Sequence, residues 1–86
     1  MDWRIVILQR GWVMVGEYHA EGEARWLEHA QVIRVWGTKN GLGELVNGPL
    51  STTVLDPAGR VDFHVLGVVA TIKVDPSAWG VKCGLV

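Results

Sequence analysis

The residues that could do chemistry are spread along the chain without a shared spacing. His19, His29 and His64 stand far apart and show none of the paired spacings that are typical of metal ligands. Cys83 is the single cysteine, which excludes an intramolecular disulfide and a zinc site built from cysteines. No histidine lies near it in the sequence, so a thiol nucleophile is not indicated. The sequence therefore predicts no metal site and no nucleophile.

Carboxylates and glycines give no catalytic pattern either. Asp56 is typical of a turn and Asp62 of a strand surface, and neither belongs to a visible acid–base pair. Gly43 and Gly48 have the spacing of a phosphate-binding loop, but Pro49 occupies the position where that motif needs lysine. A dinucleotide pattern that begins at residue 41 lacks its third glycine. We therefore expect neither an enzyme nor a cofactor-binding protein.

Nucleic-acid binding would need a local patch of basic residues. The formal net charge is −1, whereas strong nucleic-acid binders usually carry a basic excess. The glutamates of residues 17–28 are interleaved with arginines, which is typical of a mixed, solvated surface. The candidate contacts to nucleic acid are Arg25 and Lys39, together with the aromatic face of Trp36.

The composition indicates one small domain with an excess of apolar side chains. The chain has 86 residues, of which 49% are hydrophobic, and these include five tryptophans. Because a domain of this size has a thin core, the surplus favours a subunit interface. Tryptophans scattered singly over the surface are the alternative. No segment has the length of a membrane span or of a signal-peptide core, and the lone cysteine fits a cytoplasmic protein.

The stretch 5–18 organises the fold around these residues. It predicts two strands, rich in β-branched and aliphatic residues, joined at residues 9–11. Apolar side chains occupy both faces of the first strand, so we expect both faces to be covered. Gly16 interrupts the second strand and predicts a bend or bulge there.

Residues 24–36 allow two interpretations. Helix propensity and a helical face shared by Trp26, Ala30 and Ile33 favour a helix over residues 24–30. A strand is preferred, because Gly22 is a poor helix start and residues 32–36 are strongly β-like. One long bent strand or two short ones would then cover the segment.

The second half of the chain predicts a loop followed by short strands. Residues 37–51 are a long irregular loop, which Leu42, Leu45 and Val46 would hold down through one short helical turn. Beyond it we expect, in order, a strand at residues 52–55, a type I turn at Asp56-Pro57-Ala58-Gly59, an alternating strand at 60–65, a turn at Leu66-Gly67 and a last strand at 68–74 that Pro76 ends.

Short strands at close spacing predict an all-β fold. We expect a small, strongly bent, antiparallel SH3-type barrel of about five strands with one short helix. This barrel would cover residues 1–76, and residues 77–86 would form a C-terminal tail.

The first half of the chain resembles the Sm-like family of small bent barrels that assemble into rings. The resemblance rests on an aliphatic strand followed by Gly11, Gly16 and Tyr18, and on the segment Leu27-Glu28-His29-Ala30. Residues 65–72 are similar to the second motif of the family. This likeness implies a ring-forming homo-oligomer, and the whole chain looks like a small bacterial or phage-borne protein.

The resemblance does not extend to the RNA-binding pocket of that family. RNA-binding members build a base pocket from an aspartate, an asparagine and an arginine, and the matching positions here are Ala20, Ala24 and Leu66. None of these side chains supplies a hydrogen bond to a base edge. The expected function is therefore a ring-forming binding or scaffold protein, with RNA or another protein as a further partner. The alternative is an Sm-like nucleic-acid binder with a re-made site.

Assembly is expected to use strand edges, because an exposed edge offers unpaired backbone groups. The strand at residues 68–74 carries a single charge, Lys73, and would pair with residues 11–19 or 32–36 of the next subunit. The expected interface residues are Val13, Val15, Val69, Thr71 and Trp79. In the competing arrangement, a monomer covers that edge with its own tail through Trp79.

Overall fold

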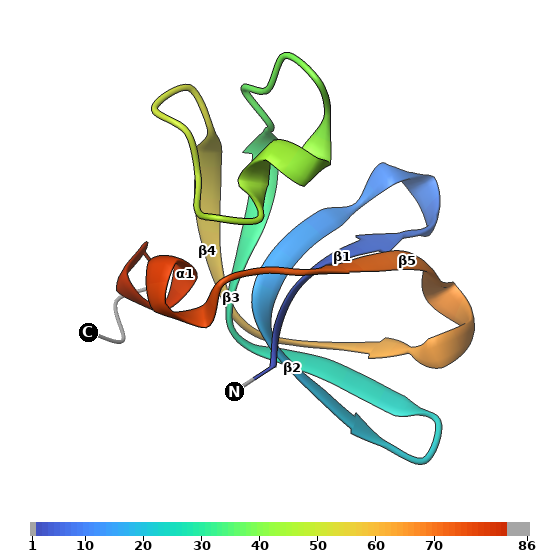
Figure 1. Ribbon diagram of the computed structural model, residues 1–86. Helices are drawn as coiled ribbons and strands as arrows, with labels where there is room; N and C mark the ends of the chain where they lie inside the picture. The colour runs from blue at the N-terminus through green and yellow to red at the C-terminus, as the bar shows by residue number, and fades with distance from the viewer. Residues whose placement is uncertain (1, 83–86) are drawn as a thin grey trace.

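The computed structural model describes residues 2–82 and contains one five-stranded antiparallel sheet and one short helix (Figure 1). The sheet order is β4-β3-β2-β1-β5. The elements are β1 (Trp3–Leu8), η1 (Gln9–Gly11), β2 (Val13–Glu21), β3 (Ala24–Val35), η2 (Leu42–Leu45), β4 (Val54–His64), η3 (Val65–Gly67), β5 (Val68–Lys73) and α1 (Pro76–Lys82), where η marks a 3-10 turn. The predicted all-β fold is confirmed. In the described residues no ladder joins β4 to β5, so these two strands are the edges of the sheet.

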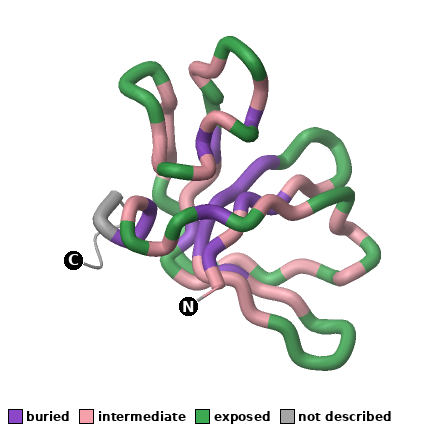
Figure 2. Tube along the Cα trace, in the orientation of Figure 1, coloured by how far each residue is buried: buried purple, intermediate pink, exposed green. Residues whose placement is uncertain are grey.

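The sheet is covered on both faces at β1, as its sequence predicted. Ile5 and Val6 are neighbours in the chain that point to opposite faces, and both are fully buried. Ile5 belongs to a cluster that also contains residues of η2 and α1. Val6 belongs to a second cluster, which β1, β2 and β3 form on the other face. Figure 2 shows the buried residues concentrated in the central strands and the exposed ones at the hairpin tips and loops.

Gly16 marks the bend that its position in β2 predicted. The register between β2 and β3 shifts between Val15 and Glu17. A Cβ at Gly16 would lie 3.0 Å from the Glu28 carbonyl oxygen and 3.2 Å from the Ala30 Cα. Glycine is therefore favoured here, because a Cβ would force the backbone of β3 to move away by a few tenths of an ångström.

The loop after β3 is tied down at both ends, and its short helical turn is the predicted one, η2. Thr52 Oγ1 donates to the Gly37 carbonyl at 2.6 Å, and Thr53 Oγ1 donates to the Trp36 carbonyl at 2.7 Å. Leu45 in η2 is fully buried in the cluster that also contains Ile5. The loop therefore forms part of the core.

β4 corrects the predicted turn at residues 56–59. These residues lie inside one continuous strand, although Gly59 has a φ of +71° and the register with β3 shifts nearby. β4 pairs on one side only, so the missing N–H of Pro57 is tolerated on an edge strand. The type I turn prediction was wrong because an edge strand accepts the proline and glycine that usually mark a turn.

The C-terminal helix α1 belongs to the fold. The Asp75 carboxylate accepts hydrogen bonds from the Ser77 backbone N–H at 3.0 Å and from its hydroxyl at 2.7 Å, which caps the helix beside Pro76 at its first position. Trp79 is fully buried, and its Nε1 donates to the Leu45 carbonyl at 2.8 Å. The part of the predicted tail that the structure describes is therefore a packed helix, and residues 83–86 lie outside the described range.

Three of the predicted interface side chains are internal. Val13, Val15 and Trp79 are buried in the core cluster of a single chain, so their assignment to a subunit interface was wrong. The reason is that η2 and α1 cover this face of the sheet, and Trp79 is part of that cover. In addition, β2 and β3 are interior strands with a paired neighbour on each side. Residues 11–19 and 32–36 therefore have no free edge for the strand of another subunit. None of the described helices is long and apolar enough to cross a membrane.

Candidate functional site

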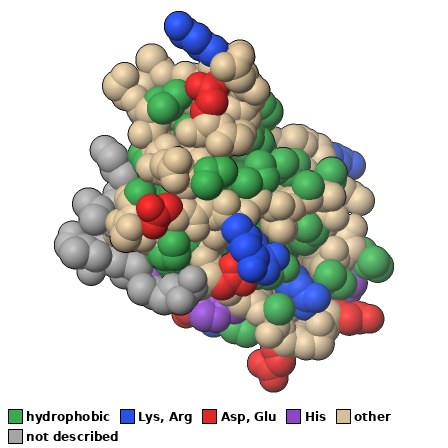
Figure 3. All heavy atoms as spheres, viewed as in Figure 1, with side chains coloured by type: hydrophobic (Ala, Val, Ile, Leu, Met, Phe, Trp, Pro, Cys, Tyr) green, Lys and Arg blue, Asp and Glu red, His purple; other side chains and the backbone are tan. Residues whose placement is uncertain are grey.

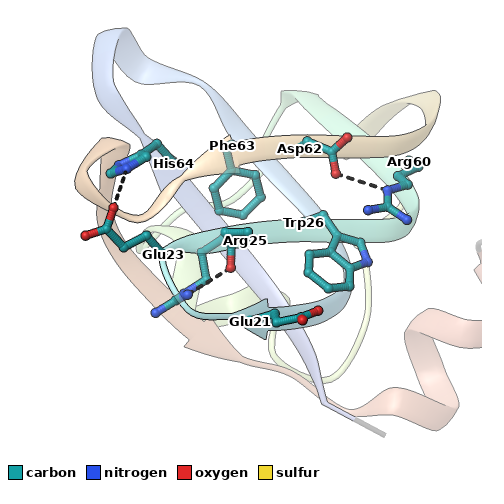
Figure 4. Close-up of a pocket in the computed structure, with 9 residues that line it drawn as sticks. Glu21, Glu23, Arg25, Trp26, Arg60, Asp62, Phe63 and His64 are labelled. Carbon is teal, nitrogen blue, oxygen red and sulfur yellow. Dashed lines mark hydrogen bonds and ion pairs between the residues drawn. The ribbon is translucent and has the colours of Figure 1, made fainter.

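The β2–β3 hairpin and β4 form a shallow depression of about 680 Å³ on the surface (Figure 4). Its position follows from the register, which sets the tip of the hairpin beside the second half of β4. The residues that line it are Glu21, Glu23, Ala24, Arg25, Trp26, Arg60, Asp62, Phe63 and His64.

Trp26 is the central aromatic side chain of this surface. Its ring stacks on His19 with 5.3 Å between centroids and 9° between planes. The Arg60 guanidinium carbon lies 4.7 Å from the centroid of the Trp26 ring, and Arg60 Nε donates to Asp62 Oδ1 at 3.0 Å. Cross-strand pairing explains the row, because Trp26 stands opposite His19 on one side and opposite Asp62 on the other.

The depression carries charges of both signs. Arg25 Nη1 donates to the Gly22 carbonyl at 2.7 Å and to the Ala24 carbonyl at 2.8 Å. The guanidinium therefore stabilises the hairpin turn. Glu23 Oε2 lies 3.3 Å from His64 Nε2. With Glu21 also at the rim, carboxylates balance the guanidinium groups, and the depression lacks the basic surplus that attracts a polyanion.

A cluster of titratable groups lies beside the depression, on the Trp26 face of the hairpin. His19 Nε2 lies 2.8 Å from Glu17 Oε1 and 2.9 Å from Glu28 Oε2. The ligand atoms of these three side chains all lie within 4.8 Å of one another. The sequence predicted no ligand set for His19. The structure brings these residues together through pairing across two strands.

The three predicted nucleic-acid contacts do not converge. Arg25 lies near the start of β3 and lines the depression, whereas Trp36 and Lys39 follow the other end of that long strand. Trp36 is exposed, and its carbonyl anchors the loop through Thr53. The structure therefore separates Arg25 from Trp36 and Lys39 by the length of β3.

The β5 edge is held in place by a polar network that reaches across three strands. Arg4 on β1 donates to Thr71 Oγ1 on β5 at 3.2 Å, and its guanidinium carbon lies 4.2 Å from the centroid of the Tyr18 ring on β2. Arg4 also hydrogen-bonds both carboxylate oxygens of Asp2 at 3.0 Å. This bond holds the pKa of the Asp2 carboxyl below its usual range, against the opposing effect of burial.

Exposed apolar side chains gather around the start of β5. Leu66 and Val69 are 79% and 66% exposed and flank the start of β5. Trp12, also exposed, follows η1, and the adjoining Leu8 pairs with Val68 of β5. Figure 3 shows hydrophobic side chains in a band across the face that carries β5, with charged groups beside it. Two of the predicted interface residues, Val69 and Thr71, thus lie on an edge strand.

Comparison of the chain with protein-family models, with curated proteins and with solved structures finds no match.

Proposed function

We propose that the protein is a homo-oligomeric binding or scaffold protein whose subunits pair head-to-tail through β5 of one copy and β4 of the next. These are the two edges of a single sheet. Contact between two different edges is heterologous, and a heterologous contact closes into a ring when the rotation between neighbours allows it. The observation that carries the proposal is the outer edge of β5, with which no strand in residues 2–82 pairs, together with the exposed apolar residues beside it.

The direction of the backbone groups supports pairing at β5. The Val74 N–H donates to the Trp3 carbonyl, which makes Trp3 and Val74 a hydrogen-bonded pair. Antiparallel pairs alternate, so the backbone groups of Ile72 and Ala70 point toward β1, and those of Thr71 and Lys73 point away from it. The outer edge of β5 thus offers a row of donors and acceptors.

The same reasoning applies to β4. The Val65 N–H donates to the Glu23 carbonyl. By the same alternation, the backbone groups of Asp62 and His64 point away from β3. A second strand could pair there without disturbing the existing ladder. In a ring, each copy would present its Trp26 depression at an equivalent position, which is the arrangement of a multivalent scaffold.

Proline substitution on β5 tests the proposal directly. We expect light scattering to give a mass of at least three chains, each of 9.5 kDa. Thr71→Pro removes an outward N–H and should yield folded monomers. Thr71→Val is the control, because it removes only the hydroxyl and should still assemble. Ala70→Pro removes an N–H that faces β1, so it should also lower the stability of the subunit.

Two results would contradict the ring. A wild-type mass of one chain would mean that the edges stay unpaired, and a mass of two chains would favour a symmetric contact between identical edges. The alternative function, RNA binding through a re-made site, makes a different prediction. Tight binding of a short single-stranded RNA that weakens steeply with salt would support it in place of the scaffold.

A further inference from the structure

We propose that Glu17, His19 and Glu28 form a binding site for a divalent transition-metal ion with the preferences of Zn²⁺. The inference does not depend on the proposed assembly. All three side chains belong to the β2–β3 hairpin, and their ligand atoms are one imidazole nitrogen and two carboxylate oxygens. Imidazole and carboxylate groups are among the ligands that Zn²⁺ takes in proteins.

Strand geometry places the three groups on one face. Glu17 and His19 are two residues apart on β2, so their side chains point to the same side of the sheet. Glu28 on β3 pairs directly with Glu17. No loop movement is needed to assemble the set, because each residue is fixed within a paired strand.

The distances between the ligand atoms suit a small ion. His19 Nε2 is 2.8 Å from one carboxylate oxygen and 2.9 Å from the other, and the whole set fits within 4.8 Å. Ligands placed 2.0–2.2 Å from a tetrahedral Zn²⁺ are separated from each other by about 3.3 Å. The nitrogen–oxygen separations in the structure are only slightly shorter than those of ligands around such an ion.

The two neighbouring carboxylates of Glu17 and Glu28 favour binding of a cation. Like charges directly opposite each other on neighbouring strands are destabilising, and Glu17 faces Glu28 in this way. In residues 2–80, both carboxylates pair with His19 and with no lysine or arginine. The nearby Arg60 is engaged by Asp62. The imidazole contributes at most one positive charge against two carboxylates, so a divalent ion would neutralise the cluster.

The surroundings orient the imidazole and leave room for an ion. Trp26 stacks on the His19 ring, which restrains the ring with Nε2 toward the carboxylates. The side chains of Glu17, His19 and Glu28 are 20%, 34% and 40% exposed, so an ion can enter and water can take a fourth position. Mg²⁺ prefers octahedral oxygen ligands and would be disfavoured by the nitrogen ligand.

Isothermal titration calorimetry with ZnCl₂ tests the site on the full chain. A Cys83→Ser background is used because a thiol is itself a zinc ligand. We expect one Zn²⁺ per chain, and no comparable binding of MgCl₂. Glu28→Gln and His19→Gln should each weaken binding by more than the roughly 10–100-fold that loss of an outer-shell partner costs.

The chain offers a matched control in His64. This residue also contacts a carboxylate, that of Glu23, but among the described residues it has just this one acidic partner. His64→Gln should therefore leave Zn²⁺ affinity unchanged. Absence of binding by the folded Cys83→Ser protein would overturn the proposal, as would equal losses in His64→Gln and His19→Gln. Circular dichroism of each variant separates lost ligation from lost folding. Visible absorption with Co²⁺ in place of Zn²⁺ reports ligation independently.

Discussion

Two buried tryptophans allow the contribution of α1 to stability to be measured by a matched pair of substitutions. Trp3 and Trp79 are both essentially fully buried in the same cluster. Replacing either with phenylalanine removes the same volume, so the cavity terms largely cancel in the comparison. The two differ at the indole N–H. Trp79 donates to the Leu45 carbonyl at 2.8 Å, whereas Trp3 Nε1 is buried without a hydrogen-bond partner in the described structure.

The difference between the variants follows from the two N–H groups. Trp79→Phe loses one buried hydrogen bond, a net cost of about 1 kcal/mol. The loss stays near that value because the Leu45 carbonyl keeps a second donor, the Gly48 N–H. Trp3→Phe instead removes an unpaired buried donor and relieves a penalty of about 1–3 kcal/mol. We therefore expect Trp79→Phe to be less stable than Trp3→Phe by about 2–4 kcal/mol.

Urea unfolding followed by circular dichroism measures this difference. Both variants are compared at one protein concentration, because assembly adds to apparent stability. For a domain of this size the difference corresponds to about 10 °C or more in Tm. Equal stability of the two variants would refute the reasoning, because the bonded Trp79 N–H and the unpaired Trp3 N–H would then contribute equally to the free energy of unfolding.

Two further predictions concern the glycines of the fold and the cap of α1. Gly37→Ala should destabilise the protein more than Gly16→Ala. Gly37 has a φ of +70°, and a Cβ there would collide with the backbone of Thr52. Gly16→Ala should cost about 1–3 kcal/mol of stability through overpacking alone. Gly43→Ala, with open space around it, is the control for both in thermal unfolding. Bonds from the side chain and backbone of Ser77 lower the pKa of Asp75, so its stabilising effect exists above the ordinary carboxyl range and is lost below it. Asp75→Ala should therefore lower Tm at pH 7, with a difference that shrinks in acid.

The strands that the sequence predicted correctly are those with strong local patterns. β1 and β5 are rich in β-branched residues, and β2 carries valines at positions 13 and 15. β3 was assigned as a strand against the helix propensity of its first half. The short helical turn at Leu42 and Leu45 was also anticipated, because two leucines in a glycine-rich loop need burial. For these elements, the secondary structure that the local sequence favours is also the one in which their apolar side chains become buried.

The errors arose where tertiary context overrides local pattern. Val13 and Val15 were assigned to an interface because the sequence shows apolar residues without showing what covers them. The covering elements are η2 and α1, which lie far along the chain. The same limit applies to residues 56–59, whose turn signal is absorbed into β4 because that strand is an edge.

The candidate metal cluster was hidden by register. Two residues, Gly22 and Glu23, connect β2 to β3, so Glu21 pairs with Ala24. Because a two-residue turn fixes every later pair of a hairpin, Glu17 must then stand opposite Glu28. Gly22 marks a break before residues 24–36 in the sequence, but it does not fix how many residues close the turn. Knowing that two residues close the turn would have been enough to bring the carboxylates together.

The two proposals depend on different parts of the sheet and can fail separately. The metal cluster lies on β2 and β3, which already have a neighbour on each side, whereas assembly requires the free edges of β4 and β5. Thr71→Pro should therefore bind one Zn²⁺ per chain while light scattering gives the mass of a monomer. Glu28→Gln should keep the mass of the assembly while its affinity for Zn²⁺ falls. If Glu28→Gln also dissociates the assembly, the hairpin must contribute to the contact between subunits. The outer edge of β5 would then be insufficient to explain it.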